Sequence, residues 1–235
     1  MEDLAQHILD IAINSLEAGA TRLEIVLRED IAANVLSFKV LDNGRGISES
    51  DVPKMLDPFY TTKKHKSVGL GIPLLQETVS KCGGTLEISA LPNRGTRLKA
   101  AFPHDHLDRA PLGDIAATLV AVIAGNGLLE LKYSHHYNKK LFTFNTSDLK
   151  PRAGGIPLQT TEVLGLLAEY LTANITELRR ENIEECGGIG STAPKTAAGN
   201  ECAAKRTPSD RVGKHGHLRY RGGRAGSCEG RIGGT

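Results

Sequence analysis

The chain has 235 residues, of which 40% are hydrophobic, and its 29 Lys and Arg against 27 Asp and Glu leave a formal net charge of +2. This composition is typical of a globular protein, and the near-zero charge gives no general argument for binding nucleic acid or a membrane surface. No apolar run approaches the roughly 18 residues that a membrane-spanning helix needs. The acidic start MEDLAQHILD is unlike a signal peptide, and the four Cys form no CxxC pair. We therefore expect a cytoplasmic protein with reduced cysteines.

The first predicted element is an N-terminal helix with a polar stripe. At about 100° per residue, His7, Asp10, Asn14 and Glu17 fall within an arc of roughly 80°, and aliphatic residues cover most of the remaining circumference. A carboxylate and an amide one turn apart on such a helix need partners. Together they can offer oxygens to a hard cation such as Mg²⁺. The alternative is an amphipathic helix whose polar face is simply solvated.

Alternating apolar residues predict strands over 21–28 and 35–41, and the second strand runs into the sequence DNGRG. Asp42 can accept a hydrogen bond from an exocyclic amine such as that of adenine. Gly44 and Gly46 carry no side chain, so a flat ring can approach the backbone there. The alternative is an ordinary hairpin turn, because Asp, Asn and Gly are also turn residues.

The next predicted helix opens at GLG, residues 69–71, with Pro73 in its first turn and Gly83 just past its end. Backbone amides at the positive end of a helix form an anion site. The preceding TTKKHK, residues 61–66, adds hydroxyls and lysines that would stabilise a polyphosphate. The alternatives are a closely packed helix start and a solvated basic loop.

Two more strands are expected over 85–89 and 97–102, joined by the turn PNRG. Thr96, at the entrance of the second of these strands, can hydrogen-bond a purine directly or through a water. Each motif is weak by itself. Their succession within about a hundred residues is what predicts a nucleotide site.

In type and order these motifs resemble the GHKL superfamily of ATP-binding domains, which includes gyrase, heat-shock chaperone ATPases, sensor histidine kinases and MutL. The resemblance covers residues 1–104. DIAINSLEAGAT is most similar to the N box of MutL, whereas DPFYTTK and GLGI resemble the F and G2 boxes of histidine kinases. It implies an α+β fold, a two-layer α/β sandwich known as the Bergerat ATP-binding fold, with ATP lying between the helices under a lid.

The resemblance also implies ATP and Mg²⁺ as cofactors and Asn14 as the metal ligand. The nucleotide-binding residues that follow from it and from the motifs are Asp42 at the adenine amine, Gly44 and Gly46 beside the base, Thr96 at the adenine, and Lys63, Gly69, Leu70 and Gly71 at the phosphates. Asp10 stands where gyrase and MutL members carry the Glu that activates water. It is one methylene shorter than Glu, and it is the candidate catalytic base.

Residues 103–111, PHDHLDRAP, are expected to form a linker to a second unit. That unit, over residues 112–180, is predicted to be a small α-β-β-α module of unknown role. Its helices are expected over 114–124 and 157–180, and its strands over 128–134 and 141–146.

Two further segments of this half carry expectations of their own. His135 and His136 lie beside the predicted hairpin turn, and we expect an exposed pair whose side chains point to opposite faces of the strand. Residues 181–235 contain few large aliphatic side chains, so a disordered tail is expected. Nucleic-acid binding by its Arg- and Gly-rich end is the less favoured interpretation.

No helix bearing a phosphoacceptor His precedes the N box in this sequence, so a complete autophosphorylating sensor kinase is not expected. Three functions remain. The favoured one is a Mg-ATP-binding, histidine-kinase-like protein that lacks its own phosphoacceptor domain and phosphorylates or regulates a partner protein. The second is a slow ATPase of the MutL or gyrase type with Asp10 as general base. The third is a non-enzymatic, nucleotide-gated interaction module in which residues 112–180 dock a partner.

Overall fold

The computed structural model describes residues 3–57, 70–151, 154–186 and 218–221. Within these residues, seven strands form one sheet in the order β6-β5-β1-β2-β4-β3-β7. The strands are β1 (Arg22–Asp30), β2 (Val35–Asp42), β3 (Thr85–Leu91), β4 (Gly95–Pro103), β5 (Glu130–Tyr137), β6 (Lys140–Asn145) and β7 (Leu218–Arg221). The helices are α1 (Leu4–Glu17), the 3-10 helix η1 (Glu49–Leu56), α2 (Gly71–Lys81), α3 (Ile115–Gly125), α4 (Thr146–Leu149) and α5 (Thr161–Cys186).

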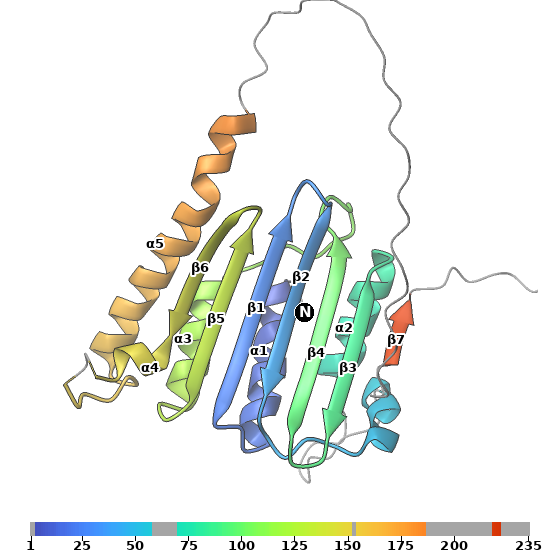
Figure 1. Ribbon diagram of the computed structural model, residues 1–235, viewed down its shortest axis with the longest axis horizontal. Coiled ribbons are helices and arrows are strands. Elements are labelled where there is room, and N and C mark those ends of the chain that lie inside the picture. The colour runs from blue at the N-terminus through green and yellow to red at the C-terminus, as the bar shows by residue number, and fades with distance from the viewer. Residues whose placement is uncertain (1–2, 58–69, 152–153, 187–217, 222–235) are drawn as a thin grey trace, which may run out of the picture.

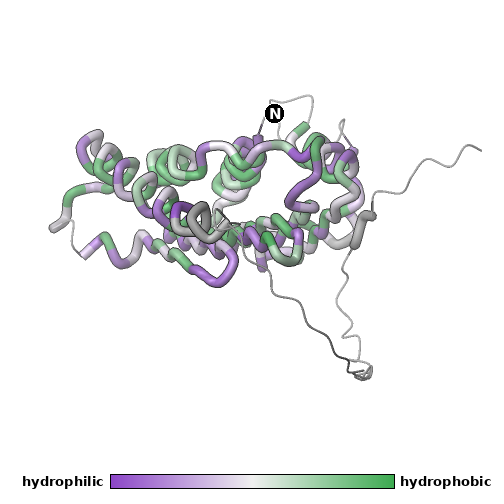
Figure 2. Tube along the Cα trace, turned by 90° about the horizontal axis from the view of Figure 1, so that it is seen from above, coloured by the Kyte–Doolittle hydropathy of each residue, from purple (hydrophilic) through white to green (hydrophobic). Residues whose placement is uncertain are grey.

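The long helices lie in one layer on one face of the sheet (Figure 1), and Figure 2 shows the two layers from above. Within this layer α1 packs between α2 and α3, and α3 packs against α5. Alternate residues of the strands are buried beneath the helices, as Leu23, Ile25 and Leu27 of β1 are. The residues between them face the opposite side of the sheet and are partly exposed. The expected two-layer α/β sandwich is therefore confirmed.

The structure shows how α1 begins and how α2 ends. The side chain of Asp3 caps α1 by accepting a hydrogen bond from the backbone N–H of Gln6 at 2.8 Å. Pro73 lies in the first turn of α2, as predicted. The chain leaves α2 through Gly83, whose positive φ of 65° suits glycine at a helix C-terminus.

The sheet is mixed, because β5 pairs in parallel with β1 whereas the other neighbouring strands are antiparallel. The order of elements expected for residues 112–180 is present. Its strands, however, lie in the same sheet as those of residues 1–104 and not in a separate one. The apolar period of a strand specifies which of its faces is buried but not which strand lies beside it, so the sequence does not reveal this pairing.

The C-terminal part differs from the expected boundary in two respects. Helix α5 continues to Cys186, past residue 180, and Leu218–Arg221 pair antiparallel with β3. This differs from a tail that is disordered throughout. An added edge strand needs backbone hydrogen bonds and no apolar composition, which explains why the composition gave no sign of it. In the part of the chain that the structure describes, no helix is both long and apolar enough to cross a bilayer.

Candidate functional site

Asp42 ends β2, and its carboxylate is held from three sides. Its Oδ1 accepts hydrogen bonds from the backbone N–H of Gly44 at 2.8 Å and of Thr96 at 3.3 Å. Its Oδ2 accepts a hydrogen bond from Ser15 Oγ of α1 at 3.0 Å. Three donors, from α1, β4 and the loop after β2, fix the direction of this acceptor, as recognition of an exocyclic amine requires.

The polar stripe of α1 reaches the same region from the helix layer. Asp10 and Asn14 are half-buried, and Asn14 Nδ2 donates to Asp10 Oδ2 at 3.2 Å. This bond turns the nitrogen of the Asn14 amide toward Asp10 and its oxygen away from that carboxylate. The oxygen is a hard ligand of the kind that Mg²⁺ prefers.

The first residue of α2 touches the Asp10 carboxylate. A Cβ placed on Gly71 would lie 1.7 Å from Asp10 Oδ2, so a side chain there would displace the Asp10 carboxylate. Leu70, which precedes the helix, gives no side-chain cap to its N-terminus and is half exposed. The start of α2 and the carboxylate of α1 therefore face each other directly. This is the place at which the sequence predicts phosphates.

Gly46 is required for a reason other than the predicted one. Its φ is +60°, and a Cβ there would lie 2.0 Å from the carbonyl oxygen of Leu91 at the end of β3. Close packing against the β3–β4 turn thus explains this glycine. Its place beside a base remains a prediction.

The structure brings together most of the residues that the sequence singled out. Two sets of contacts meet on α1: Asp42 with Gly44, Thr96 and Ser15, and Asp10 with Asn14 and Gly71. Thr96 contributes its backbone N–H, and the contact of its side chain with a purine remains a prediction. Lys63 and Gly69 lie outside the described residues. Ser15 was missed, and no sequence signal distinguishes it from the neighbouring small residues of α1.

His7 belongs to the contact between α1 and α2 and not to either of these sets. It is 1% exposed, and its Nε2 lies 3.3 Å from Thr78 Oγ1 of α2. Burial lowers the pKa of His7, and the nearby Asp10 and Asp3 carboxylates offset only part of this effect. A neutral, buried imidazole at this place packs the two helices together.

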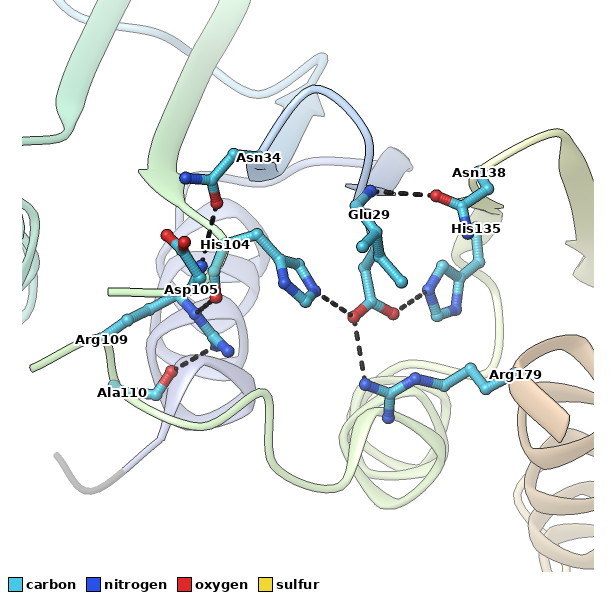
Figure 3. Close-up of polar contacts among 10 residues, drawn as sticks. Glu29, Asn34, His104, Asp105, Arg109, Ala110, His135, Asn138 and Arg179 are labelled. Atoms are coloured by element: carbon cyan, nitrogen blue, oxygen red, sulfur yellow. Dashed lines mark hydrogen bonds and ion pairs between the residues drawn. The ribbon is translucent and has the colours of Figure 1, made fainter. Parts of the chain in front are cut away.

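A second polar cluster surrounds Glu29, near the far end of β1 (Figure 3). Glu29 is 1% exposed, and its two carboxylate oxygens contact His135 Nε2 at 2.9 Å and Arg179 of α5 at 3.0 Å. His104 Nε2, just after β4, lies 3.7 Å away. Burial works to raise the pKa of Glu29, but the hydrogen bond from His135 and the charge of Arg179 outweigh it and hold the pKa below its ordinary value.

This cluster corrects one expectation and exposes one omission. His135 is not exposed but fully buried, whereas His136 faces the other side of the sheet, as the alternation predicted. Glu29 was missed, although a signal for it exists. It continues the buried phase of Leu23, Ile25 and Leu27, which places a carboxylate on the buried face of β1.

Residues 1–106 match the model of the family described as histidine kinase-, DNA gyrase B-, and HSP90-like ATPase. Residues 1–106 are thus similar to this family, and we refer to them below as the ATPase domain. The described residues of the two sets around Asp42 and Asp10 all lie within this ATPase domain, whereas α3, β5, β6 and α5 lie beyond its matched range.

Curated relatives that match the ATPase domain include sensor histidine kinases. The chain is 26% identical over 110 residues to the sensor histidine kinase ZraS of Escherichia coli O157:H7, a match that covers 47% of this chain and 24% of that protein. It is 32% identical over 103 residues to the histidine-protein kinase AtoS of Escherichia coli K12, covering 43% of this chain and 17% of the relative. The chain thus spans less than a quarter of the length of either relative.

Among solved structures, the Aquifex aeolicus MutL ATPase domain complexed with ADP superposes with a TM-score of 0.40 at 16% identity. That superposition covers 66% of this chain and 68% of the other.

Proposed function

We propose that the ATPase domain binds Mg-ATP and that the chain transfers the γ-phosphoryl group to a partner protein. The observation that supports this most directly is that one helix, α1, contacts both Asp42 and the start of α2. Ser15 contacts Asp42, and Asn14, one residue earlier, contacts Asp10, which lies against Gly71. Adenine bound at Asp42 would then leave the phosphates at the N-terminus of α2.

The donors present suit Mg²⁺ held together with a nucleotide. Mg²⁺ commonly takes only one or two protein oxygens and completes its shell with water and substrate phosphates. Asn14 would supply its amide oxygen from the stripe of α1. The ion would neutralise charge on the phosphates. The amides at the start of α2 would add their own partial positive charge.

Transfer to a partner is favoured because the curated relatives of the ATPase domain are named as histidine kinases. In that reaction a nucleophilic side chain of the partner attacks the γ-phosphorus. The bond from this phosphorus to the bridging oxygen breaks, and ADP leaves. The partner protein, a cytoplasmic location and the absence of nucleic-acid and membrane binding remain predictions.

Hydrolysis is the second candidate, and the position of Asp10 favours it. Its carboxylate lies at the start of α2, where a water attacking the terminal phosphate would stand. From there Asp10 would take the proton of that water as a general base.

The destination of the phosphoryl group distinguishes the two reactions. We would incubate the chain with γ-labelled ATP, alone and with extract of its source cells, and follow label on protein and as free phosphate. Transfer predicts label on a second protein. Hydrolysis predicts free phosphate from the isolated chain that is lost in Asp10→Asn but kept in Glu17→Gln, an exposed carboxylate on the same helix. If the chain binds ATP but forms neither labelled protein nor free phosphate, both reactions are contradicted. Nucleotide-gated binding of a partner would then remain.

A further inference from the structure

The first turn of α1 is held by residues that lie more than a hundred positions later in the chain. The N–H groups of Leu4 and Ala5 donate to the carbonyl oxygens of Pro111 and Leu112, each at 2.9 Å. The first four N–H groups of a helix have no partner within the helix. The segment between β4 and α3 thus provides two of these partners.

Close packing and one side-chain contact accompany these backbone bonds. Gly113 has a φ of +77°, and a Cβ there would lie 2.4 Å from the carboxylate carbon of Asp3, the residue that caps α1. Thr118 Oγ1 of α3 reaches the carbonyl oxygen of Ala5 at 3.4 Å. The chain therefore passes the start of α1 so closely that a side chain at position 113 would displace the Asp3 carboxylate.

The same segment is fixed to the sheet at its other end (Figure 3). Arg109 donates from Nε to the carbonyl oxygen of His104 at 2.8 Å and from Nη1 to that of Ala110 at 2.9 Å. His104 in turn lies beside Glu29. The carbonyl groups that bind α1 are thereby placed relative to β1 and β4.

We propose that residues 109–118 are a positioning element of the nucleotide site, an inference that rests on the proposed function. At 1.5 Å per residue, Ser15 lies about 16 Å along α1 from Leu4. A helix transmits an axial shift along its whole length. The segment therefore sets where Asn14 and Asp10 stand relative to Gly71, and where Ser15 stands relative to Asp42. It lies outside the matched range of the ATPase domain, yet it determines the geometry of that domain's site.

The test compares two glycines with similar backbones and different surroundings. Gly113→Ala forces the cap of α1 to move. Gly155→Ala, at a φ of +88° with no atom within 4 Å of the added Cβ, carries the backbone strain alone. We expect the dissociation constant for Mg-ATP, measured by calorimetry well below the melting temperature of each variant, to rise about tenfold in Gly113→Ala. In Gly155→Ala it should stay within about twofold of wild type.

Arg109→Ala is the second variant, because it removes the hydrogen bonds of the Arg109 side chain without crowding Asp3. It tests the inference if Gly113→Ala does not fold. Its control is Arg180→Ala, an exposed side chain of α5. The inference would be overturned if Arg109→Ala and any folded Gly113→Ala bound Mg-ATP with unchanged affinity. It would also be overturned if Gly155→Ala lost as much affinity as Gly113→Ala. Either result would leave the proposed function standing. Absence of nucleotide binding by the wild-type chain would instead overturn the proposed function, and this inference with it.

Discussion

At the scale of single residues, the contact between Asp10 and Gly71 determines how close the Asp10 carboxylate lies to the start of α2. The two come from different helices, and a Cβ on Gly71 would overlap the carboxylate of Asp10. The short Asp side chain is in contact with the start of α2 as it stands. The distance between the two helices therefore suits Asp at this position. Although Asp10 is one methylene shorter than Glu, its carboxylate still reaches the start of α2.

Gly71→Ala should displace the Asp10 carboxylate from Asn14 and from the start of α2. We expect phosphoryl transfer or hydrolysis to fall about tenfold or more, because small displacements of a reacting group carry large kinetic penalties. The control is Gly165→Ala in α5, where the added Cβ meets no atom within 4 Å. That variant should keep its turnover and gain about 0.5–1 kcal/mol of stability. Wild-type turnover in Gly71→Ala would contradict the assigned contact.

At this scale the sequence was informative about residue types and less so about their partners. Two residues of the predicted stripe, Asp10 and Asn14, contact each other near the start of α2, and the acceptor Asp42 is bound by Ser15 of the same helix. Ser15 and Glu29 were not predicted because neither belongs to a motif that is associated with a known function. The partner of Glu29 on α5, Arg179, is 150 residues away in sequence, and no local pattern connects the two.

At the scale of elements, α5 is attached to the sheet by a charged contact as well as by apolar packing. Arg179 of α5, whose side chain is half-exposed, reaches the buried carboxylate of Glu29, and its guanidinium lies 5.9 Å from the ring centre of Tyr137. A buried carboxylate remains charged only where donors such as these surround it. The position of α5 and the charge of Glu29 are therefore linked.

Arg179→Met should lower the free energy of unfolding at pH 7 by about 1–2 kcal/mol, because a charged hydrogen bond is lost at a half-exposed side chain. The folded pKa of Glu29 lies below its ordinary value of 4.5, so the contact contributes fully above that value and is lost as the pH falls through the folded pKa. The stabilities of variant and wild type, from urea unfolding, should thus converge in acid. Arg180→Met, in an exposed ion pair, should change stability by less than about 0.5 kcal/mol. A difference that stays constant down to pH 3 would contradict the assignment to Glu29.

The elements themselves were largely predictable, because apolar periods of two and of about three to four residues are local properties of the chain. The pairing of β5 with β1 was not, since it joins segments about a hundred residues apart. The hydrogen bonds from the start of α1 to Pro111 and Leu112 were not predictable either, because every residue has a backbone carbonyl group and the sequence does not show which of them is used.

At the scale of the whole molecule, two polar clusters lie at opposite ends of β1 and β2. Asp42 pairs in register with Leu23, and Glu29 pairs with Leu36. The six residue steps from Leu23 to Glu29 correspond to about 20 Å along the strand. The predicted nucleotide site and the cluster that attaches α5 are therefore separate. Residues 104–112 contact Glu29 at one end and the start of α1 at the other.

The central claim is that the stripe of α1 holds Mg²⁺ and nucleotide, and one titration tests it most directly. ATP binding is measured with and without Mg²⁺ for wild type, for Asn14→Ala and for Asn174→Ala, a control Asn whose side chain bonds the backbone of α5. The account predicts affinity that depends on Mg²⁺ in wild type and in Asn174→Ala, and that falls sharply in Asn14→Ala. Equal binding by all three proteins, or binding indifferent to Mg²⁺, would contradict it.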